Sequence, residues 1–420
     1  MPELQEPAVS PAPLLAPATS SSKIALLGWS LHAIEAMDCI DRPFVVVGPE
    51  LFRTYADDHG IRFVSWDFEK RNENSHELAT SLQALGVVTA VPLYEETVSW
   101  AGAVNSVLRG EPRLFNQSLL FRDKAMMKRK AQISGIRVGV FEEAETREDV
   151  LRFLKRVNRA LLKLEGDPED PVHLKAFTGA GCVGHRLIRT PADVDEVPLT
   201  SFPCLLESHL DGQEFSCEVF VHAGKIRFMN ITEYVHLGHS NFVPASERLE
   251  SKREAIQIAV EELIEAFGFR YGMIHPEWFV TADGKLNFGE VAARVPGGHI
   301  FQLIKRAYGF DPFAGFVLCS DPNTSEAELE AFFPSEDAFE TRAGCLMVYP
   351  RAEIASKLEV PAELEEDSYF ESHDLFVPVN PKVAERVGFG NHYGTVFFTG
   401  PEAGRLEELL LRWEEFDFYS

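Results

Sequence analysis

Basic residues are scarce in this sequence. The chain has 40 Lys and Arg residues against 65 Asp and Glu residues, which gives a formal net charge of -25 at pH 7. A field of that sign opposes association with polyanions and with anionic membrane surfaces, so we expect neither nucleic acid nor a membrane as a partner. An anionic ligand such as a nucleotide must instead be held by a few local cations and by metal.

Paired cysteines and long apolar runs are also missing. The six cysteines are scattered without a CxxC pair, which predicts neither a zinc knuckle nor a disulfide framework. No apolar run is long enough to span a bilayer, and the N-terminus lacks the basic region of a signal peptide. We therefore expect a cytoplasmic protein whose thiols are reduced and mostly buried.

The length of 420 residues exceeds what one ordinary core supports, so the chain should divide into several units. Residues 1–22 are rich in Pro, Ala and Ser, which is typical of a disordered tail. Residues 23–115 alternate buried strands with helices, which predicts a parallel α/β domain. We expect a second unit over 116–310, with mixed α+β character, and a third over 311–420.

Acidic residues occur at the edge where the α/β domain should bind a ligand. Glu95 and Glu96 follow the apolar run "GVVTAVP", and helix-like sequence begins directly after them. A carboxylate there can cap the helix or contact a substrate, and the sequence alone favours the cap.

A lysine and a glycine-rich loop provide a candidate phosphate site. Lys175 ends an expected strand, and "FTGAGCVG" at 177–184 follows it with three glycines, one of which is Gly181. Glycines let backbone N–H groups approach an oxyanion, and the lysine adds a positive charge. The loop lacks the GK[ST] of a Walker motif, and a glycine-rich turn beside a lysine is, on its own, more often a simple hairpin turn.

The segment 205–219, "LLESHLDGQEFSCEV", offers groups suited to a nucleoside. Glu207 stands at the end of one expected strand, and Glu214 lies seven residues on, at the start of the next. A linker between two lobes exposes backbone N–H and C=O groups to an adenine edge, and a carboxylate can accept both ribose hydroxyls. The alternative is two surface acids around an Asp-Gly turn.

The segment 275–299, "HPEWFVTADGKLNFGEVAARVPGGH", is expected to form a hairpin with acids among core residues. Glu277 and Glu290 are each flanked by apolar residues, and pairing across the turn would put them on one face. Two carboxylates so placed repel each other unless a cation lies between them, and magnesium suits such oxygen ligands. Arg294 and the following glycines, including Gly298, could bind phosphate or an oxyanion. A glycosidase-like acid pair or plain surface acids are the alternatives.

The order of these motifs resembles the ATP-grasp superfamily. Asp123-Lys124, Lys175 with its glycine loop, the acids seven residues apart, and "HPE...NFGEVAARVPGG" follow one another over 23–310. The resemblance implies an ATP-grasp fold over 116–310. It also implies that 23–115 is the pre-ATP-grasp domain in front and that 311–420 is a closing subdomain.

The resemblance also implies a role for each matching residue. Lys124 and Lys175 would hold the nucleotide phosphates under the loop that contains Gly181. Two magnesium ions, with manganese as the alternative metal, would be bridged by Glu277 and Glu290. Many family members carry Asn two residues after the second metal glutamate, whereas this chain has Ala292, so one protein ligand would be missing. The remaining assignments are adenine for the chain from Glu207 through His209 to Leu210, ribose for Glu214, and the transferred phosphoryl group and oxyanion for Arg294 and Gly298.

Within that superfamily, "NITEYVHLG" at 230–238 resembles the bacterial L-amino-acid ligases. The likeness implies that Glu233 and His236 hold the amino-acid substrate, although His236 could equally be a structural histidine. The implied activity is ATP-dependent joining of a carboxylate to an amine through an acyl phosphate. Another ATP-grasp ligase or carboxylase and a non-catalytic nucleotide-binding protein are the rival interpretations. The expected partners are the small-molecule substrates and a second copy in a homodimer.

Overall fold

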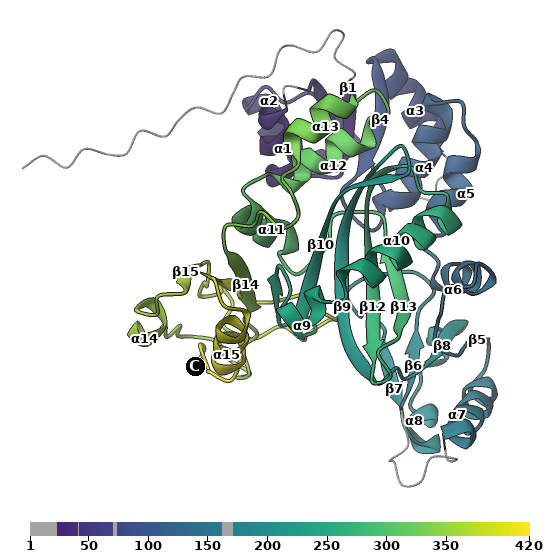
Figure 1. Ribbon diagram of the computed structural model, residues 1–420, viewed down its shortest axis with the longest axis vertical. Coiled ribbons are helices and arrows are strands. Elements are labelled where there is room, and N and C mark those ends of the chain that lie inside the picture. The colour runs from purple at the N-terminus through teal and green to yellow at the C-terminus, as the bar shows by residue number, and fades with distance from the viewer. Residues whose placement is uncertain (1–22, 41, 70–73, 162–170) are drawn as a thin grey trace, which may run out of the picture.

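The computed structural model describes residues 23–40, 42–69, 74–161 and 171–420. The predicted N-terminal tail, residues 1–22, lies outside this described part. Three sheets organise the described residues, and helices cover them (Figure 1). No helix in this part of the chain is long and apolar enough to cross a membrane.

The first sheet is parallel, as the alternation of strands and helices predicts. Its strand order is β3-β2-β1-β4, and the apolar run of β1 is buried. A parallel sheet needs helical crossovers, and these cover its faces. The strands are β1 (Lys23–Leu27), β2 (Phe44–Gly48), β3 (Phe63–Ser65) and β4 (Val87–Pro92), and the helices are α1 (Leu31–Ala36), α2 (Arg53–Asp58), α3 (Ser75–Ala84) and α4 (Thr97–Leu108).

A smaller antiparallel sheet follows two connecting helices, α5 (Arg113–Leu119) and α6 (Lys124–Ile133). Asp123 caps α6 by accepting a hydrogen bond from the Met126 backbone N–H, which fixes Lys124 in the first turn. The strand order of this sheet is β5-β8-β6-β7. Its strands are β5 (Phe141–Ala144), β6 (Val172–Lys175), β7 (Arg186–Ile188) and β8 (Cys204–Ser208), with helices α7 (Arg147–Leu161) and α8 (Pro191–Asp195) beside them.

The third sheet has eight strands in the order β13-β12-β9-β10-β11-β14-β16-β15 and runs through the middle of the molecule (Figure 1). Helix α10 (Arg253–Phe267) lies along one of its faces and ends at Gly268, whose φ of +64° suits glycine. The strands and the second helix of this part are β9 (Gly212–His222), β10 (Lys225–His236), β11 (Ser240–Val243), β12 (Tyr271–Thr281), β13 (Leu286–Ala292) and α9 (Glu247–Glu250).

The two faces of this sheet differ in chemistry. In β9, Phe215, Cys217 and Val219 point into an apolar core that they share with α10. The residues between them point to the opposite face, because side chains alternate along a strand. That face presents Glu214, Ser216 and Glu218, and we call it the polar face.

The C-terminal residues extend the same sheet. Strands β14, β16 and β15 continue it beyond β11. Helices α12 and α13 lie against the first domain instead, where Phe316 shares a core with Ile24 (Figure 1). The predicted boundary at residue 310 therefore does not coincide with a boundary between sheets. The elements are α11 (Ile300–Tyr308), α12 (Pro312–Ser320), α13 (Glu326–Phe332), β14 (Arg342–Met347), α14 (Ala362–Glu365), β15 (Phe370–His373), β16 (Thr395–Gly400) and α15 (Ala403–Glu414).

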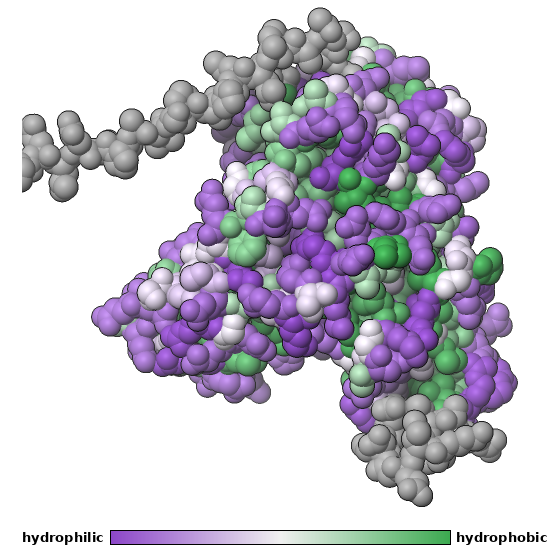
Figure 2. All heavy atoms as spheres, viewed as in Figure 1, coloured by the Kyte–Doolittle hydropathy of each residue, from purple (hydrophilic) through white to green (hydrophobic). Residues whose placement is uncertain are grey.

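Hydrophilic residues cover most of the surface in the view of Figure 2, and hydrophobic ones gather over β9, β12 and β13 below α10. This pattern agrees with a chain that is 25% charged and carries an excess of acidic residues.

Candidate active site

The hairpin predicted over 275–299 is formed by β12 and β13, with Gly284 at its turn in a positive-φ conformation. Between the pairs Pro276–Val291 and Trp278–Phe288 the register shifts by one residue. Glu277 alone then faces two residues, Gly289 and Glu290, which is a β-bulge. A Cβ at position 289 would lie 2.9 Å from the Glu277 carbonyl oxygen, so glycine is needed for this close approach.

A buried histidine, His275, lies between the carboxylates of Glu218 and Glu277. His275 Nδ1 lies 3.0 Å from Glu218 Oε1, and its Nε2 lies 3.5 Å from Glu277 Oε1. Burial alone would lower the pKa of His275, but the hydrogen bonds to Glu218 and Glu277 raise it to about 9. Glu218 also accepts hydrogen bonds from Asn230 and Thr232 on β10. The histidine is therefore a cation at neutral pH that fixes the position of Glu277.

Two predicted phosphate lysines lie beside these acids. Lys124 Nζ is 2.8 Å from Glu290 Oε2, and Lys175 Nζ is 2.7 Å from Glu207 Oε2. Burial would raise the pKa of Glu290, but Lys124 and Lys175 outweigh it and lower that pKa to about 2. Lys128, one turn along α6 from Lys124, pairs with the other oxygen of Glu207 at 2.6 Å. Burial and the nearby carboxylates act in opposite directions on Lys175, and the carboxylates raise its pKa above the usual value.

Negative charge on the polar face exceeds what these lysines neutralise. Burial and the neighbouring Glu277 carboxylate raise the pKa of Glu214 to about 8. The Glu290 carboxylate contributes to the same upward shift of the Glu214 pKa. Such a cluster of carboxylates attracts a hard cation, and its oxygen donors match magnesium. Ala292 pairs with His275 in the sheet and offers no ligand. Among the described residues, no group of three or more His, Cys, Asp or Glu side chains is arranged to hold a metal by itself.

The glycine-rich loop at 177–184 covers this site. The Phe177 carbonyl accepts from the Lys124 backbone N–H at 2.8 Å, and the Gly179 carbonyl accepts from Lys124 Nζ at 3.2 Å. Burial raises the pKa of the Cys182 thiol to about 11, and the Glu277 carboxylate adds to that shift, so the loop tip lies near the acids. The Gly181 carbonyl accepts from the Phe389 backbone N–H at 2.9 Å. The C-terminal part of the chain therefore contacts the loop.

The segment from Glu207 to Leu210, which was predicted to contact adenine, connects the small sheet to β9. His209 belongs to a stack of three histidines in which His173 lies between His185 and His209. The ring nitrogens are 3.0 Å apart between His173 and His185 and 3.1 Å apart between His173 and His209. Burial and Lys175 lower the pKa of His173 to about 3, so that ring is neutral and donates through only one nitrogen.

Arg294 is held by the acidic loop of the first domain. Its Nε donates to Glu95 Oε2 at 2.9 Å, and Arg122 Nη1 lies 3.1 Å from the other oxygen of Glu95. The prediction that these acids cap the following helix was wrong, because Glu96 at the start of α4 makes no side-chain cap hydrogen bond. Gly298 has a φ of +60°, and its carbonyl accepts from Asn241 Nδ2 at 3.1 Å.

The structure does not bring Glu233 to this site. Glu233 pairs with Phe215 across β10 and β9, so its side chain lies on the α10 side of the sheet and not on the polar face. There it accepts from Arg248 at 2.8 Å and from the Ser246 backbone N–H at 2.8 Å. The structure therefore places the predicted substrate residue Glu233 on the opposite face of the sheet from Glu214 and Glu218, where it binds Arg248 and the Ser246 backbone.

His236 lies at the end of β10, where its Nδ1 is 2.6 Å from Glu414 Oε1 of α15. Its ring stacks on His239 with centroids 4.9 Å apart. The nearby Gly238 packs against Phe389, which also contacts the glycine loop through Gly181. His236 thus borders the loop region, and its contact with a substrate stays a prediction.

Three residues of the site were missed in the sequence. His275 stands directly before the Pro-Glu of the predicted hairpin, and Glu218 is a buried acid between apolar residues, whereas Lys128 stands among basic residues and gives no such signal. Buried charges are rarely found without partners, so that context is a usable signal.

The arrangement of sheets and the converging charges define an ATP-grasp fold. Residues 189–302 match the family model described as "ATP-grasp domain". Among solved structures, an L-amino acid ligase from Bacillus licheniformis superimposes with a TM-score of 0.72 at 17% identity, over 95% of this chain and 98% of that one. N5-carboxyaminoimidazole ribonucleotide synthetase from Thermotoga maritima gives a TM-score of 0.66 at 15% identity, over 94% and 98% of the two chains.

One curated relative is similar in sequence. The L-arginine-specific L-amino acid ligase of Bacillus subtilis is 23% identical over 234 residues, which are 51% of this chain and 54% of that protein. The match therefore spans about half the length of the curated relative. All three proteins are ligases or synthetases by name, and the two solved structures share the fold of this chain.

Proposed function

We propose that this protein is an ATP-dependent carboxylate–amine ligase that joins two amino acids, or an amino acid and a related acid, and releases ADP and phosphate. The observation that carries the proposal is the convergence of Lys124, Lys175, Glu214, Glu277 and Glu290 on one face. Opposite charges from five elements, α6, β6, β9, β12 and β13, meet there beside a glycine-rich loop.

In this proposal the lysines bind the nucleotide and the carboxylates bind the metal. Lys124 and Lys175 would bind the phosphates, and the carboxylates of Glu277 and Glu290 would hold magnesium, with phosphate oxygens and water completing the coordination. Adenine would contact the segment that contains His209, and Glu214 would accept from ribose hydroxyls. When bound, the metal neutralises negative charge on the phosphates.

The residues of the chain would position the reactants. A substrate carboxylate attacks the γ-phosphorus to give an acyl phosphate and ADP, and an amine then displaces phosphate to form the amide. Arg294 would stabilise the negative charge that develops in both steps, and Glu95 fixes the orientation of its guanidinium group. The Gly298 region would supply backbone donors. The loop at 177–184 would exclude water from the acyl phosphate.

The similarity to two amino-acid ligases supports amino acids as substrates. His236 at the border of the loop is the remaining candidate for a substrate contact, because Glu233 lies on the other face. The synthetase with similar structure favours the rival interpretation, in which the chain is an ATP-grasp ligase for another metabolite acid.

The test is phosphate release from ATP over a matrix of amino-acid pairs, with products identified by mass. Release that requires two amino acids, together with a product mass equal to their sum minus water, is the expected result. Phosphate release without any such product, or only with a non-amino-acid carboxylate, would move the protein to the rival branch.

A non-catalytic nucleotide-binding protein would give a different result. It would bind ATP in a filter or calorimetric assay but release no phosphate with any acid and amine. The homodimer expected from family resemblance is checked separately, by light scattering of the full chain at the concentration used in the assay.

A further inference from the structure

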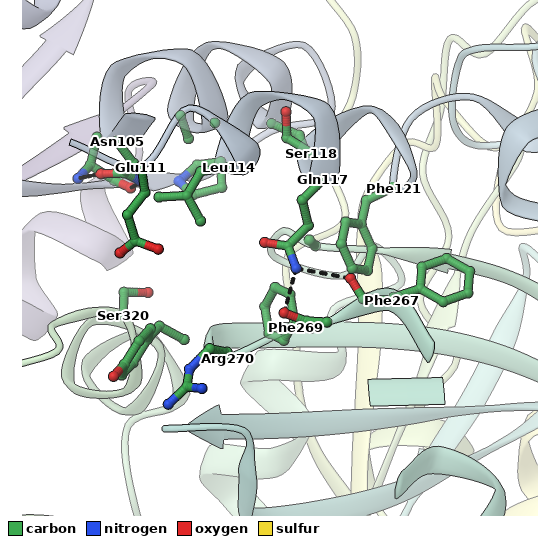
Figure 3. A pocket seen from close by; sticks show the side chains of 18 of the residues that line it. Asn105, Glu111, Leu114, Gln117, Ser118, Phe121, Phe267, Phe269, Arg270 and Ser320 are labelled. Carbon is green, nitrogen blue, oxygen red and sulfur yellow. Dashed lines mark hydrogen bonds between the residues drawn. The ribbon is translucent and has the colours of Figure 1, made fainter. Parts of the chain in front are cut away.

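A cavity of about 540 Å³ lies away from the polar face. It is enclosed by α4 and α5 on one side and by α12 and the segment between α10 and β12 on the other. Figure 3 shows Glu111, Ser320 and Arg270 at one end of it, and Phe121 and Phe267 at the other. A volume of this size is in the range of small-molecule sites.

Aromatic side chains form the closed end. The ring of Phe121 lies 5.6 Å from that of Phe267 and 5.3 Å from that of Phe269, in tilted and edge-on arrangements. Leu114, from α5, also lines the cavity. Gln117 bridges the two sides by donating to the Phe267 carbonyl at 2.9 Å (Figure 3). This end suits an apolar ligand group, aromatic or branched.

An arginine that forms no ion pair with any described residue lines the other end of the cavity. Arg109 donates through Nη2 to the Ser320 carbonyl at 2.9 Å and to Thr89, but it makes no ion pair with any described residue. Its Nε is buried and lacks a hydrogen-bond partner among the described residues. Burial lowers the pKa of Arg109 from its ordinary value, and the Glu111 and Asp321 carboxylates offset that shift only in part.

The other charges at this end leave a net positive balance. Arg113 and Glu111 pair with each other at 2.7 Å and so neutralise one another. The Arg270 guanidinium lies 5.8 Å from the centre of the Tyr271 ring and forms no ion pair among the described residues. With Asp321 counted against Arg109 and Arg270, one positive charge remains in excess at this end of a chain whose net charge is -25. This end therefore attracts a small anion.

We propose that this cavity is a second ligand site, separate from the ATP-grasp site, for a small carboxylic acid with an apolar body. The carboxylate would pair with Arg109, and the apolar body would pack on Phe121 and Phe267. An arginine fork matches a carboxylate in geometry, and the pairing would supply the partner that the buried group lacks.

The walls of the cavity connect it to the first site. Ala293 precedes Arg294 on the chain, Phe121 precedes Arg122, and both arginines bind Glu95. A ligand in the cavity therefore contacts the residues next to those that hold the Glu95 carboxylate. Its binding does not depend on the proposed ligase activity.

The probe is 3-phenylpropionate, titrated calorimetrically into the full-length protein with saturating magnesium and ADP present to occupy the nucleotide site. We expect a dissociation constant of about 1 mM or below, which is within the binding free energy that a ligand of this size can reach. The neutral 3-phenylpropanamide should bind at least tenfold more weakly, because it cannot pair with Arg109.

Two variants locate the binding. Leu114→Trp fills the cavity, and Arg109→Gln removes the charge, and each should weaken the probe at least tenfold. Leu411→Trp, at an exposed leucine of α15, is the matched control for the first, and Arg156→Gln, at a surface ion pair, for the second. Loss of binding in Arg109→Gln has a second explanation, which is unfolding of the cavity wall. The deciding result is therefore the affinity of Leu114→Trp for the probe, measured on protein whose melting temperature equals that of the wild type. Equal affinity in Leu114→Trp and the wild type, or equal affinity for acid and amide, would overturn the proposal.

Discussion

The polar face of the eight-stranded sheet and the face under α10 differ by a single residue step along β9. Glu214, Ser216 and Glu218 point one way, and Phe215, Cys217 and Val219 point the other. Buried charges on the polar face are tolerated because oppositely charged and hydrogen-bonding partners surround them. The opposite face is stabilised by burial of apolar area. Activity and stability should therefore respond to substitutions on different faces.

The strongest test of this division is Phe215→Ala on the α10 face. The side chain is fully buried, so its loss should reduce the free energy of unfolding by about 3–5 kcal/mol. Urea unfolding followed by circular dichroism measures the effect. Phe376→Ala, at a half-exposed phenylalanine, should cost less than about 0.5 kcal/mol. A similar loss in both variants would mean that the α10 face does not carry the stability.

On the polar face, Glu290→Gln should abolish most of the activity. The change keeps the shape but removes the charge that pairs with Lys124 and is proposed to hold magnesium. We expect ATP-dependent phosphate release to fall by about 10²–10³-fold, as when one electrostatic contact to the transition state is lost. Glu143→Gln, at an exposed pair with Arg129, is the control. Wild-type release by Glu290→Gln would refute the metal assignment.

Glu233→Gln tests the assignment of Glu233 to the α10 face. The loss of its charge should weaken the bonds from Arg248 and the Ser246 backbone, and cost about 1 kcal/mol of stability, a small value because Arg248 is exposed. The KM for each amino acid should change less than about twofold. A tenfold rise in that KM would show instead that Glu233 contacts the substrate. By contrast, Glu277→Gln should lower kcat.

Part of this sheet was predictable from the sequence. The apolar residues that flank Glu277 and Glu290 predicted the hairpin that carries both acids, and its turn contains Gly284. The bulge at Gly289 was not predictable, since it depends on the register between two strands and not on either one alone. The pairing of β11 with β14 joins residues about a hundred positions apart, so no local pattern could show that one sheet includes both.

The face on which Glu233 lies was also unpredictable, because it too depends on the register between strands. The resemblance relied on a short Glu-x-x-His pattern, but the face of Glu233 is set by its pairing with Phe215 across the sheet. His275 was overlooked for a different reason. Its charge depends on Glu218, a residue 57 positions away, and only the folded chain places the two within 3.0 Å.

A change in stability with pH is also expected from the polar face. The pKa of Glu214 is about 8 in the folded protein, because of burial and Glu277, and lies near 4.5 in the unfolded chain. Between these values the folded state binds more protons, so the stability contribution of Glu214 falls as pH rises. Without nucleotide and metal, the unfolding midpoint of the wild type should decline relative to that of Glu214→Gln between pH 5 and 9. A difference that stays constant over this range, or that grows in favour of the wild type, would show that Glu214 does not share its site with the other two carboxylates. Magnesium and ATP should reduce the decline, since a bound cation offsets the repulsion.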